Sequence, residues 1–144
     1  MRRLLPVLAV AAAVVAVAVP AASQDSAAKK IAWKKTVLDT KFRAEGVAVA
    51  DVNKDGKIDV LNGEYWYEAP DWKPHELQPP KDHGDPQHNY SRVFCCWAED
   101  LNGDGYPDLI VIDFPGKPCY WMENPKGQAT TSDGKPVHWK RWSA

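Results

Sequence analysis

Short apolar runs alternate with Gly, Pro, Asp and Asn along most of this chain, and few of them exceed six residues. Runs of this length, rich in Val, Ile, Tyr and Trp and bounded by turn residues, predict β-strands and no long helix. We expect a first group of strands at 34–38, 46–50, 57–61 and 65–68, and a weaker one at 72–77, where Pro74 permits only an edge strand. We expect a second group at 93–98, 109–112, 119–123 and 137–142. The pattern therefore predicts an all-β fold.

The two groups of strands belong to an internal repeat. Segments 51–59 and 100–108 both read D-x-N-x-D-G-x-x-D, and their first residues are 49 positions apart. Further along each unit, Trp-Tyr-Glu-Ala-Pro at 66–70 matches Trp-Met-Glu-Asn-Pro at 121–125. A period of about 40–50 residues with roughly four short strands is typical of a β-propeller blade.

Two units are too few for a closed propeller, which uses about four to eight blades. We expect residues 31–144 to hold about two blades plus the first strand of a third, an incomplete propeller. A single blade cannot bury both of its faces. We therefore expect further blades downstream in a longer chain as partners of these two, or else assembly with other chains.

The repeated acidic loops are candidate Ca²⁺ sites. Ca²⁺ takes six to eight oxygen ligands, and alternate positions of a tight loop can direct several side-chain oxygens inward. Glycine at position 6 permits the sharp turn. The predicted ligands of the first site are Asp51, Asn53, Asp55, the carbonyl of Lys57, and Asp59. Those of the second site are Asp100, Asn102, Asp104, the carbonyl of Tyr106, and Asp108.

An EF-hand starts with the same pattern, but its twelfth position is a bidentate Glu between two helices. Here that position is Asn62 in one copy and Val111 in the other, and apolar strand-like residues follow both loops. The ninth-position Asp must then close each site. The other interpretation is that both loops are Asp/Asn/Gly turns that bind no metal.

With these loops and their flanking strands, residues 31–144 resemble the FG-GAP/VCBS repeats of integrin-α-like β-propellers. The resemblance implies a seven-bladed propeller with Ca²⁺ in loops between strands, in a secreted, periplasmic or cell-surface protein. The Phe-Gly and Gly-Ala-Pro motifs themselves are absent. The Trp-x-Glu-x-Pro signature resembles a subgroup of bacterial exported proteins with such repeats. Similar propellers also occur in sugar-processing enzymes, including polysaccharide lyases and aldos-2-ulose dehydratase.

The N-terminus has the form of a secretory signal peptide over residues 1–23. A basic start with Arg2 and Arg3 precedes an apolar run over 4–19, and small residues follow at 21–23. An uncleaved membrane anchor is the alternative. Residues 24–30 form a polar tether. After removal of 1–23 we expect a chain with no membrane span, located outside the cell or in the periplasm.

The charge and the cysteine spacing argue against nucleic-acid binding and against a zinc or redox motif. Without Arg2 and Arg3 the 18 Lys and Arg become 16, against 19 Asp and Glu, a formal charge of −3. No basic stripe for nucleic acid is present. An exported chain can form disulfides, so we expect Cys119 to pair with Cys95 or Cys96. No C-x-x-C spacing exists for a zinc ribbon or a redox motif.

The segment 79–92 is the candidate ligand loop. It places His83, Asp85, His88 and Arg92 in a long connection between blades, where such groups can bind a transition metal or act as acids and bases. The other interpretation is a solvated loop bent by Pro. No residue is assigned a catalytic role. We expect a Ca²⁺-binding scaffold module with a carbohydrate or protein ligand; the alternative is part of a carbohydrate-active lyase or dehydratase.

Overall fold

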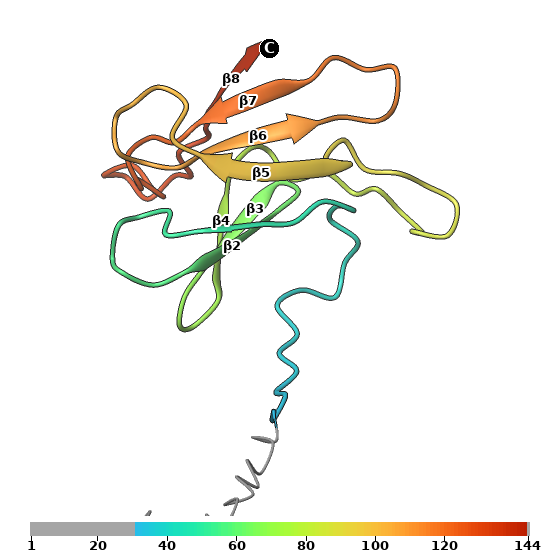
Figure 1. Ribbon diagram of the computed structural model, residues 1–144, viewed down its shortest axis with the longest axis horizontal. Helices are drawn as coiled ribbons and strands as arrows, with labels where there is room; N and C mark the ends of the chain where they lie inside the picture. The colour runs from blue at the N-terminus through green and yellow to red at the C-terminus, as the bar shows by residue number, and fades with distance from the viewer. Residues whose placement is uncertain (1–30, 144) are drawn as a thin grey trace, which may run out of the picture. The chain divides into compact units, whose positions relative to one another are not determined.

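Eight short strands and the turns between them make up the computed structural model, which describes residues 31–143 (Figure 1). The predicted signal peptide (1–23) and tether (24–30) lie outside the described residues. The strands are β1 (Ala48–Ala50), β2 (Asp59–Asn62), β3 (Tyr65–Glu68), β4 (Lys73–Glu76), β5 (Cys95–Glu99), β6 (Asp108–Ile112), β7 (Tyr120–Glu123) and β8 (Lys140–Ser143). No helix occurs in residues 31–143, so the all-β prediction is confirmed there, and no described segment is a helix able to cross a membrane.

The strands form two four-stranded antiparallel sheets, ordered β1-β2-β3-β4 and β5-β6-β7-β8. Each sheet is one copy of the sequence repeat, with its acidic loop between the first two strands. The prediction that the chain ends in the first strand of a third blade is wrong. Instead, β8 pairs with β7 through Trp121 and Trp142 and is the fourth strand of the second sheet. It corresponds to β4, because Trp139 precedes β8 as Trp72 precedes β4.

The strand expected at 34–38 does not form. The structure holds this segment through Asp39, whose carboxylate accepts hydrogen bonds from the backbone N–H groups of Thr40 and Lys41. The same carboxylate accepts bonds from Arg43 Nε at 2.7 Å and from the Tyr67 hydroxyl at 3.0 Å. An Asp that bonds its own following backbone favours a turn over a strand ladder.

We expect Asp39→Asn to make the free energy of unfolding less dependent on pH in the acidic range. Burial acts to raise the pKa of Asp39, but hydrogen bonds from Lys41, Arg43 and Tyr67 prevail and lower it from 3.8 to about 2. A lowered folded-state pKa adds stability above pH 3.8, and that stability is lost as pH falls toward 2. In urea denaturation at several pH values, the difference between wild type and Asp39→Asn should therefore shrink between pH 4 and 2. A difference that does not change with pH would contradict this account, and Asp71→Asn is the control.

The two sheets stack on each other through non-equivalent faces, a head-to-tail arrangement. Paired residues form a row across the first sheet, and all four members are at most 8% exposed: Ala48, Leu61, Trp66 and His75. The corresponding row of the second sheet lies largely open, with Trp97 53% and Trp142 37% exposed: Trp97, Ile110, Trp121 and Trp142. The second sheet instead buries its opposite face, represented by Leu109 and Met122. One face of the first sheet thus packs on the other face of the second.

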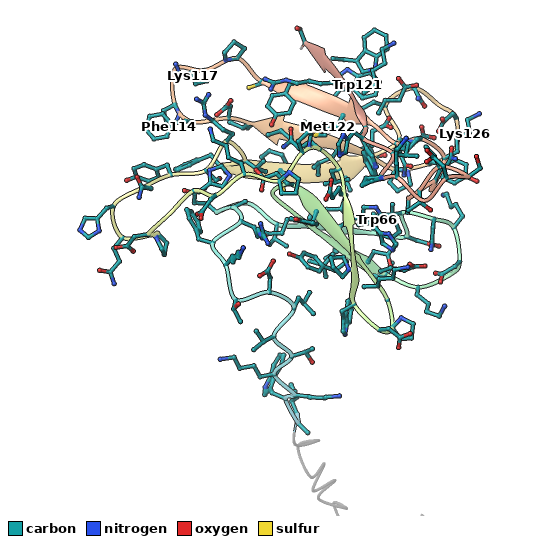
Figure 2. All side chains as sticks on the ribbon, turned by 180° about the vertical axis from the view of Figure 1, so that it is seen from behind. Trp66, Phe114, Lys117, Trp121, Met122 and Lys126 are labelled. Atoms are coloured by element: carbon teal, nitrogen blue, oxygen red, sulfur yellow. The ribbon has the colours of Figure 1, made fainter. Side chains whose placement is uncertain are left out.

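Among the described residues, an apolar core lies between the sheets. It combines Leu61, Trp66 and Leu77 of the first unit with Leu109 and Met122 of the second. Trp66 and Met122 are labelled in Figure 2. Near the first strands the backbones approach closely, because Gly46 donates its N–H to the Val93 carbonyl at 3.0 Å. A Cβ at Gly46 would meet the Cys95 backbone at 3.0 Å, so this approach depends on glycine.

The expected disulfide does not form: all three cysteines are free in the structure. Cys95 and Cys96 are adjacent on β5, so the pleat points them to opposite faces of the sheet. Cys96 faces the core, where burial raises the pKa of its thiol to about 11. Cys119 precedes β7 and is exposed.

Candidate functional site

The first acidic loop, residues 51–58, is organised by side-chain oxygens that accept backbone N–H groups. Asp51 accepts from Asp55 at 3.0 Å and from Gly56 at 2.9 Å. Asn53 Oδ1 also accepts from the Asp55 N–H, at 3.1 Å, and Asp55 accepts from the Lys57 N–H, at 2.9 Å. Oxygen atoms at positions 1, 3 and 5 therefore converge on one tight turn, in which Gly56 has a positive φ of 84°.

The second loop, residues 100–107, repeats these bonds atom for atom. Asp100 accepts from the N–H groups of Asp104 at 3.1 Å and Gly105 at 2.8 Å. Asn102 Oδ1 accepts from Asp104 at 2.9 Å, and Asp104 accepts from Tyr106 at 2.9 Å. The two units thus agree in hydrogen bonding as well as in sequence.

The ninth-position carboxylates are buried and join each loop to its sheet. Asp59 accepts from the N–H groups of Val52 at 3.0 Å and Ala69 at 2.8 Å, and it is 0% exposed. Burial raises the pKa of Asp59, and the carboxylates of Asp55 and Asp51 raise it further, against the lowering effect of its two backbone donors. A negative charge at this position is therefore costly in the protein alone.

The second unit shows the same balance at Asp108, which is also 0% exposed. Its carboxylate accepts from the N–H groups of Leu101 at 3.1 Å and Asn124 at 2.9 Å. Burial raises the pKa of Asp108, its backbone donors lower it, and the Asp104 carboxylate raises it.

The Glu of the Trp-x-Glu-x-Pro signature holds the loop asparagine. Asn53 Nδ2 donates to Glu68 at 2.9 Å, and Asn102 Nδ2 lies 3.4 Å from Glu123 in the second unit. Because the amide nitrogen is held outward by the Glu, the amide oxygen faces the loop interior. The signature thus serves the acidic loop directly, a role that its sequence distance of 15 residues from Asn53 does not reveal.

Whether these loops suit a cation follows from their donor atoms. Each offers two partly exposed or exposed carboxylates, an amide oxygen and a backbone carbonyl, all of them the hard oxygen donors that Ca²⁺ prefers. In residues 31–143 no three His, Cys, Asp or Glu side chains gather in a metal-binding arrangement. The donor set therefore fits Ca²⁺ only if the Asn side chain and main-chain carbonyls complete it.

Asn124 connects the two acidic loops. Its side-chain N–H groups donate to the Val52 carbonyl of the first loop at 3.0 Å and to the Pro107 carbonyl of the second at 2.9 Å. Its side-chain oxygen accepts from the Gly127 N–H at 2.7 Å. Asn124 is 1% exposed, and the repeated motif that contains it does not reveal this role.

The candidate ligand loop does not bring its charged residues together. Asp85 and His88 pair with each other at 2.7 Å on the surface. Arg92 lies 3.9 Å from the buried carboxylate of Asp113, a residue that precedes the turn after β6. His83 alone turns inward, so these four residues do not form one site.

His83 pairs with Glu64, which lies in the β2–β3 turn. His83 Nε2 is 2.9 Å from Glu64 Oε1, and each side chain is only 4% exposed. The second carboxylate oxygen, Glu64 Oε2, is buried without a hydrogen-bond partner in the described residues. The Phe42 ring packs edge-on against His83, with ring centroids 6.2 Å apart. Glu64 is a single acid within a turn and belongs to no sequence pattern, so the sequence alone does not identify it.

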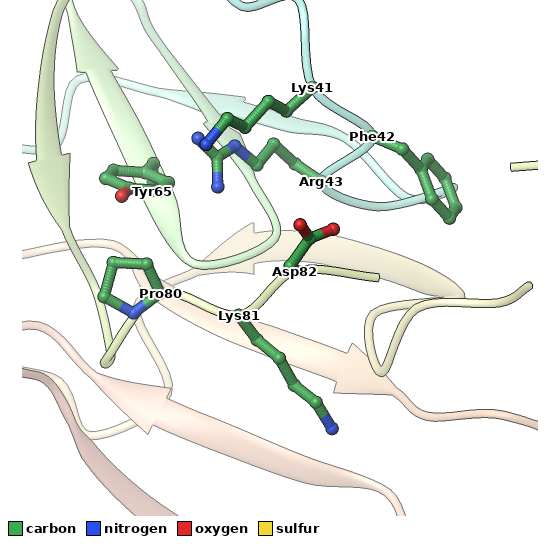
Figure 3. Close-up of a pocket in the computed structure, with 7 residues that line it drawn as sticks. All are labelled: Lys41, Phe42, Arg43, Tyr65, Pro80, Lys81 and Asp82. Atoms are coloured by element: carbon green, nitrogen blue, oxygen red, sulfur yellow. The ribbon is translucent and has the colours of Figure 1, made fainter. Parts of the chain in front are cut away.

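The acidic loops and the His83–Glu64 pair occupy opposite ends of the sheets. The acidic loops follow β1 and β5, whereas the turn with Glu64 follows β2 and the ligand loop precedes β5. In an antiparallel sheet, connections after successive strands lie at alternating ends. At the end with His83, a cavity of about 250 Å³ opens between segments 41–43 and 80–82 and Tyr65 (Figure 3).

No family model matches this chain, and comparison with curated proteins and with solved structures finds no match.

Proposed function

We propose that this chain is an exported, Ca²⁺-binding module of β-propeller repeats that serves as a binding scaffold. The observation that carries the proposal is the duplicated loop, in which the same oxygens hold the same backbone N–H groups in both units. Chance turns rarely repeat a whole hydrogen-bond arrangement together with its supporting Glu. The repetition supports a common task for the two loops.

A structural cation would remove the electrostatic cost of each loop. Asp59 and Asp108 are buried close to other carboxylates, and their raised pKa values express that cost. A divalent ion held by positions 1, 3, 5 and 9 and the position-7 carbonyl would offset the charge and rigidify the turn between two strands. Because the loops also meet at Asn124, this stiffening would reach the contact between the units.

The packing of the two sheets supports the propeller. The row of the first sheet that contains Trp66 is covered by the second sheet, whereas the corresponding row with Trp97, Trp121 and Trp142 is open. Head-to-tail contacts of this kind can repeat until a ring closes. We propose that another four-stranded unit with the same repeat covers this row.

The cation is tested by thermal unfolding of the full chain with excess Ca²⁺ or EDTA. Ca²⁺ should raise the stability by about 2.7 kcal/mol per site when its concentration is 100 times Kd. Asp104→Ala and Asp55→Ala should each remove the part of the Ca²⁺ stabilisation that comes from one loop. Asp71→Ala changes an exposed acid outside both loops and should keep the full response.

A melting temperature that is the same in Ca²⁺ and EDTA would overturn the Ca²⁺ role. An equal response of Asp104→Ala and wild type would place the ion elsewhere than in the second loop. Mg²⁺ at the same concentration is the matched ion, since it demands a tighter octahedral site and should have a smaller effect.

A further inference from the structure

The cavity in Figure 3 lies at the end of the first sheet remote from the acidic loops, and three separate segments build it. Lys41 and Arg43 come from the segment before β1, Tyr65 begins β3, and Pro80 and Asp82 belong to the ligand loop. Its volume of about 250 Å³ is enough for one small ring with its substituents. Loops held on a rigid sheet commonly carry binding sites.

Two cationic groups point into this cavity. Figure 3 shows Lys41 and Arg43 extending in the same direction, toward Tyr65, with the Asp82 carboxylate facing them. Arg43 is held in place by Asp39 at 2.7 Å, and its guanidinium lies 4.5 Å from the centroid of the Tyr65 ring. Lys41 makes no ion pair with any described residue. The lining holds three cations, Lys41, Arg43 and Lys81, against the Asp82 carboxylate. With Asp39 paired to Arg43, a formal charge of +1 remains around the cavity.

The walls of the cavity are held by buried contacts. Asp82 immediately precedes His83, which its contact with Glu64, 2.9 Å between Nε2 and Oε1, holds in the protein. Phe42, which lines the cavity, packs on the His83 ring. On the opposite side, the Tyr67 hydroxyl and Arg43 both bond Asp39. The positions of Asp82 and Arg43 are thus set before any ligand arrives, which lowers the entropic cost of binding.

We propose that this cavity binds an anionic sugar unit, one that carries a carboxylate or sulfate group. The inference deepens the proposed binding role of the module and rests on it. The anionic group lies between Lys41 and Arg43, whose N–H donors make the strong, charge-assisted hydrogen bonds that carboxylate and sulfate oxygens accept. Tyr65 and Pro80 contact the apolar C–H face of the ring.

Asp82 distinguishes a sugar from a simple anion. A carboxylate in the site opposes the binding of a second negative charge but accepts hydrogen bonds from hydroxyl groups. A ligand that matches the whole cavity therefore combines one anionic group with neighbouring hydroxyls and an apolar face. A uronate ring or a sulfated sugar has all three features, whereas inorganic sulfate has only the first.

The experiment is a calorimetric titration of the full chain in Ca²⁺ with short oligosaccharides of polygalacturonate and of chondroitin sulfate. Neutral dextran oligosaccharides, poly-glutamate of matched charge and inorganic sulfate are the comparison probes. We expect binding of at least one acidic oligosaccharide, at least tenfold tighter than each of the three comparison probes. Binding should weaken as salt rises, because the contact is partly electrostatic.

Lys41→Gln should weaken that binding about tenfold or more, since an exposed Lys can be changed without loss of the fold. Lys73→Gln, which changes an exposed Lys on β4, is the matched control and should leave the affinity unchanged. Asp82→Asn should reduce the preference for sugars over inorganic sulfate.

The proposal is overturned if no acidic oligosaccharide binds, or if Lys41→Gln binds as tightly as wild type. Equal affinity for poly-glutamate and for the sugars would also overturn it, because it would indicate a general anion site for acidic peptides. The thermal response to Ca²⁺ is recorded on the same samples. A chain that melts higher with Ca²⁺ but binds no sugar refutes the sugar site alone, whereas sugar binding without a Ca²⁺ response refutes the Ca²⁺ role alone.

Discussion

Asn124→Ala is expected to destabilise the protein by roughly 2–6 kcal/mol, because each stranded buried carbonyl costs about 1–3 kcal/mol. The side chain of Asn124 donates to the carbonyls of Val52 and Pro107, which belong to different acidic loops. At 1% exposure, water cannot replace the lost donors without opening the contact. Urea denaturation of the variant, in Ca²⁺ and in EDTA, measures the effect.

Asn124→Asp separates hydrogen bonding from packing. Aspartate has the size of asparagine, but it would face two carbonyl oxygens with acceptors instead of donors. We expect it to be at least as destabilising as alanine. A mild effect of Asn124→Asp would instead show that volume is what matters. Asn89→Ala is the control, because the Asn89 side chain is exposed and bonds only the carbonyl of Asp85.

His83→Leu is expected to destabilise the protein by about 1–3 kcal/mol, the cost of leaving a buried polar group without its hydrogen-bond partner. Glu64 Oε2 already lacks a partner, and the substitution would leave both carboxylate oxygens buried and unpaired. The same change should loosen the wall of the cavity next to Asp82. Denaturation gives the stability, and hydrogen exchange over residues 79–92 reports the loop.

Glu64→Leu/His83→Leu tests whether the cost arises from the unpaired carboxyl group of Glu64. Replacing both partners with apolar residues is often neutral or stabilising, so the double variant should regain much of the stability that His83→Leu loses. In a double-mutant cycle, the two changes should be strongly coupled. Additivity within about 0.5 kcal/mol would contradict a direct energetic link between the two side chains.

If these outcomes hold, the two ends of the stacked sheets have separate roles. At one end, acidic loops 51–58 and 100–107 meet through Asn124 and stabilise the contact between units. At the other end, the pair Glu64–His83 fixes the ligand loop over the first sheet. The cavity proposed to bind a ligand lies at this second end.

Much of the fold could be predicted from local patterns. Positions 51–59 and 100–108 share the pattern D-x-N-x-D-G-x-x-D, and the strands that follow them, β2 and β6, were both expected. The prediction failed where pairing decides the structure: a short segment such as 34–38 becomes a strand only if it pairs with the edge of a sheet. Here Asp39 bonds Tyr67 and its own backbone instead.

The last strand shows the same limit. Residues 140–143 have strand-forming character, but their sequence does not state which sheet they join. The structure places β8 against β7, so it completes the second sheet. Strand order depends on contacts between distant segments. The apolar pattern of a single strand does not indicate which strand it will pair with.

The sequence by itself determined the all-β class, the period of the repeat and the oxygen-rich loops, because turns and strands depend on neighbouring residues. Only the tertiary structure decided that Glu64 meets His83, that Asn124 joins two loops, and that Lys41 and Arg43 share a cavity with Asp82. Each of those contacts joins residues from different turns, loops or segments. Such contacts form only when the sheets are assembled. Whether a buried polar group finds a partner depends on segments that are distant in the sequence, so the residues next to it do not reveal the pair.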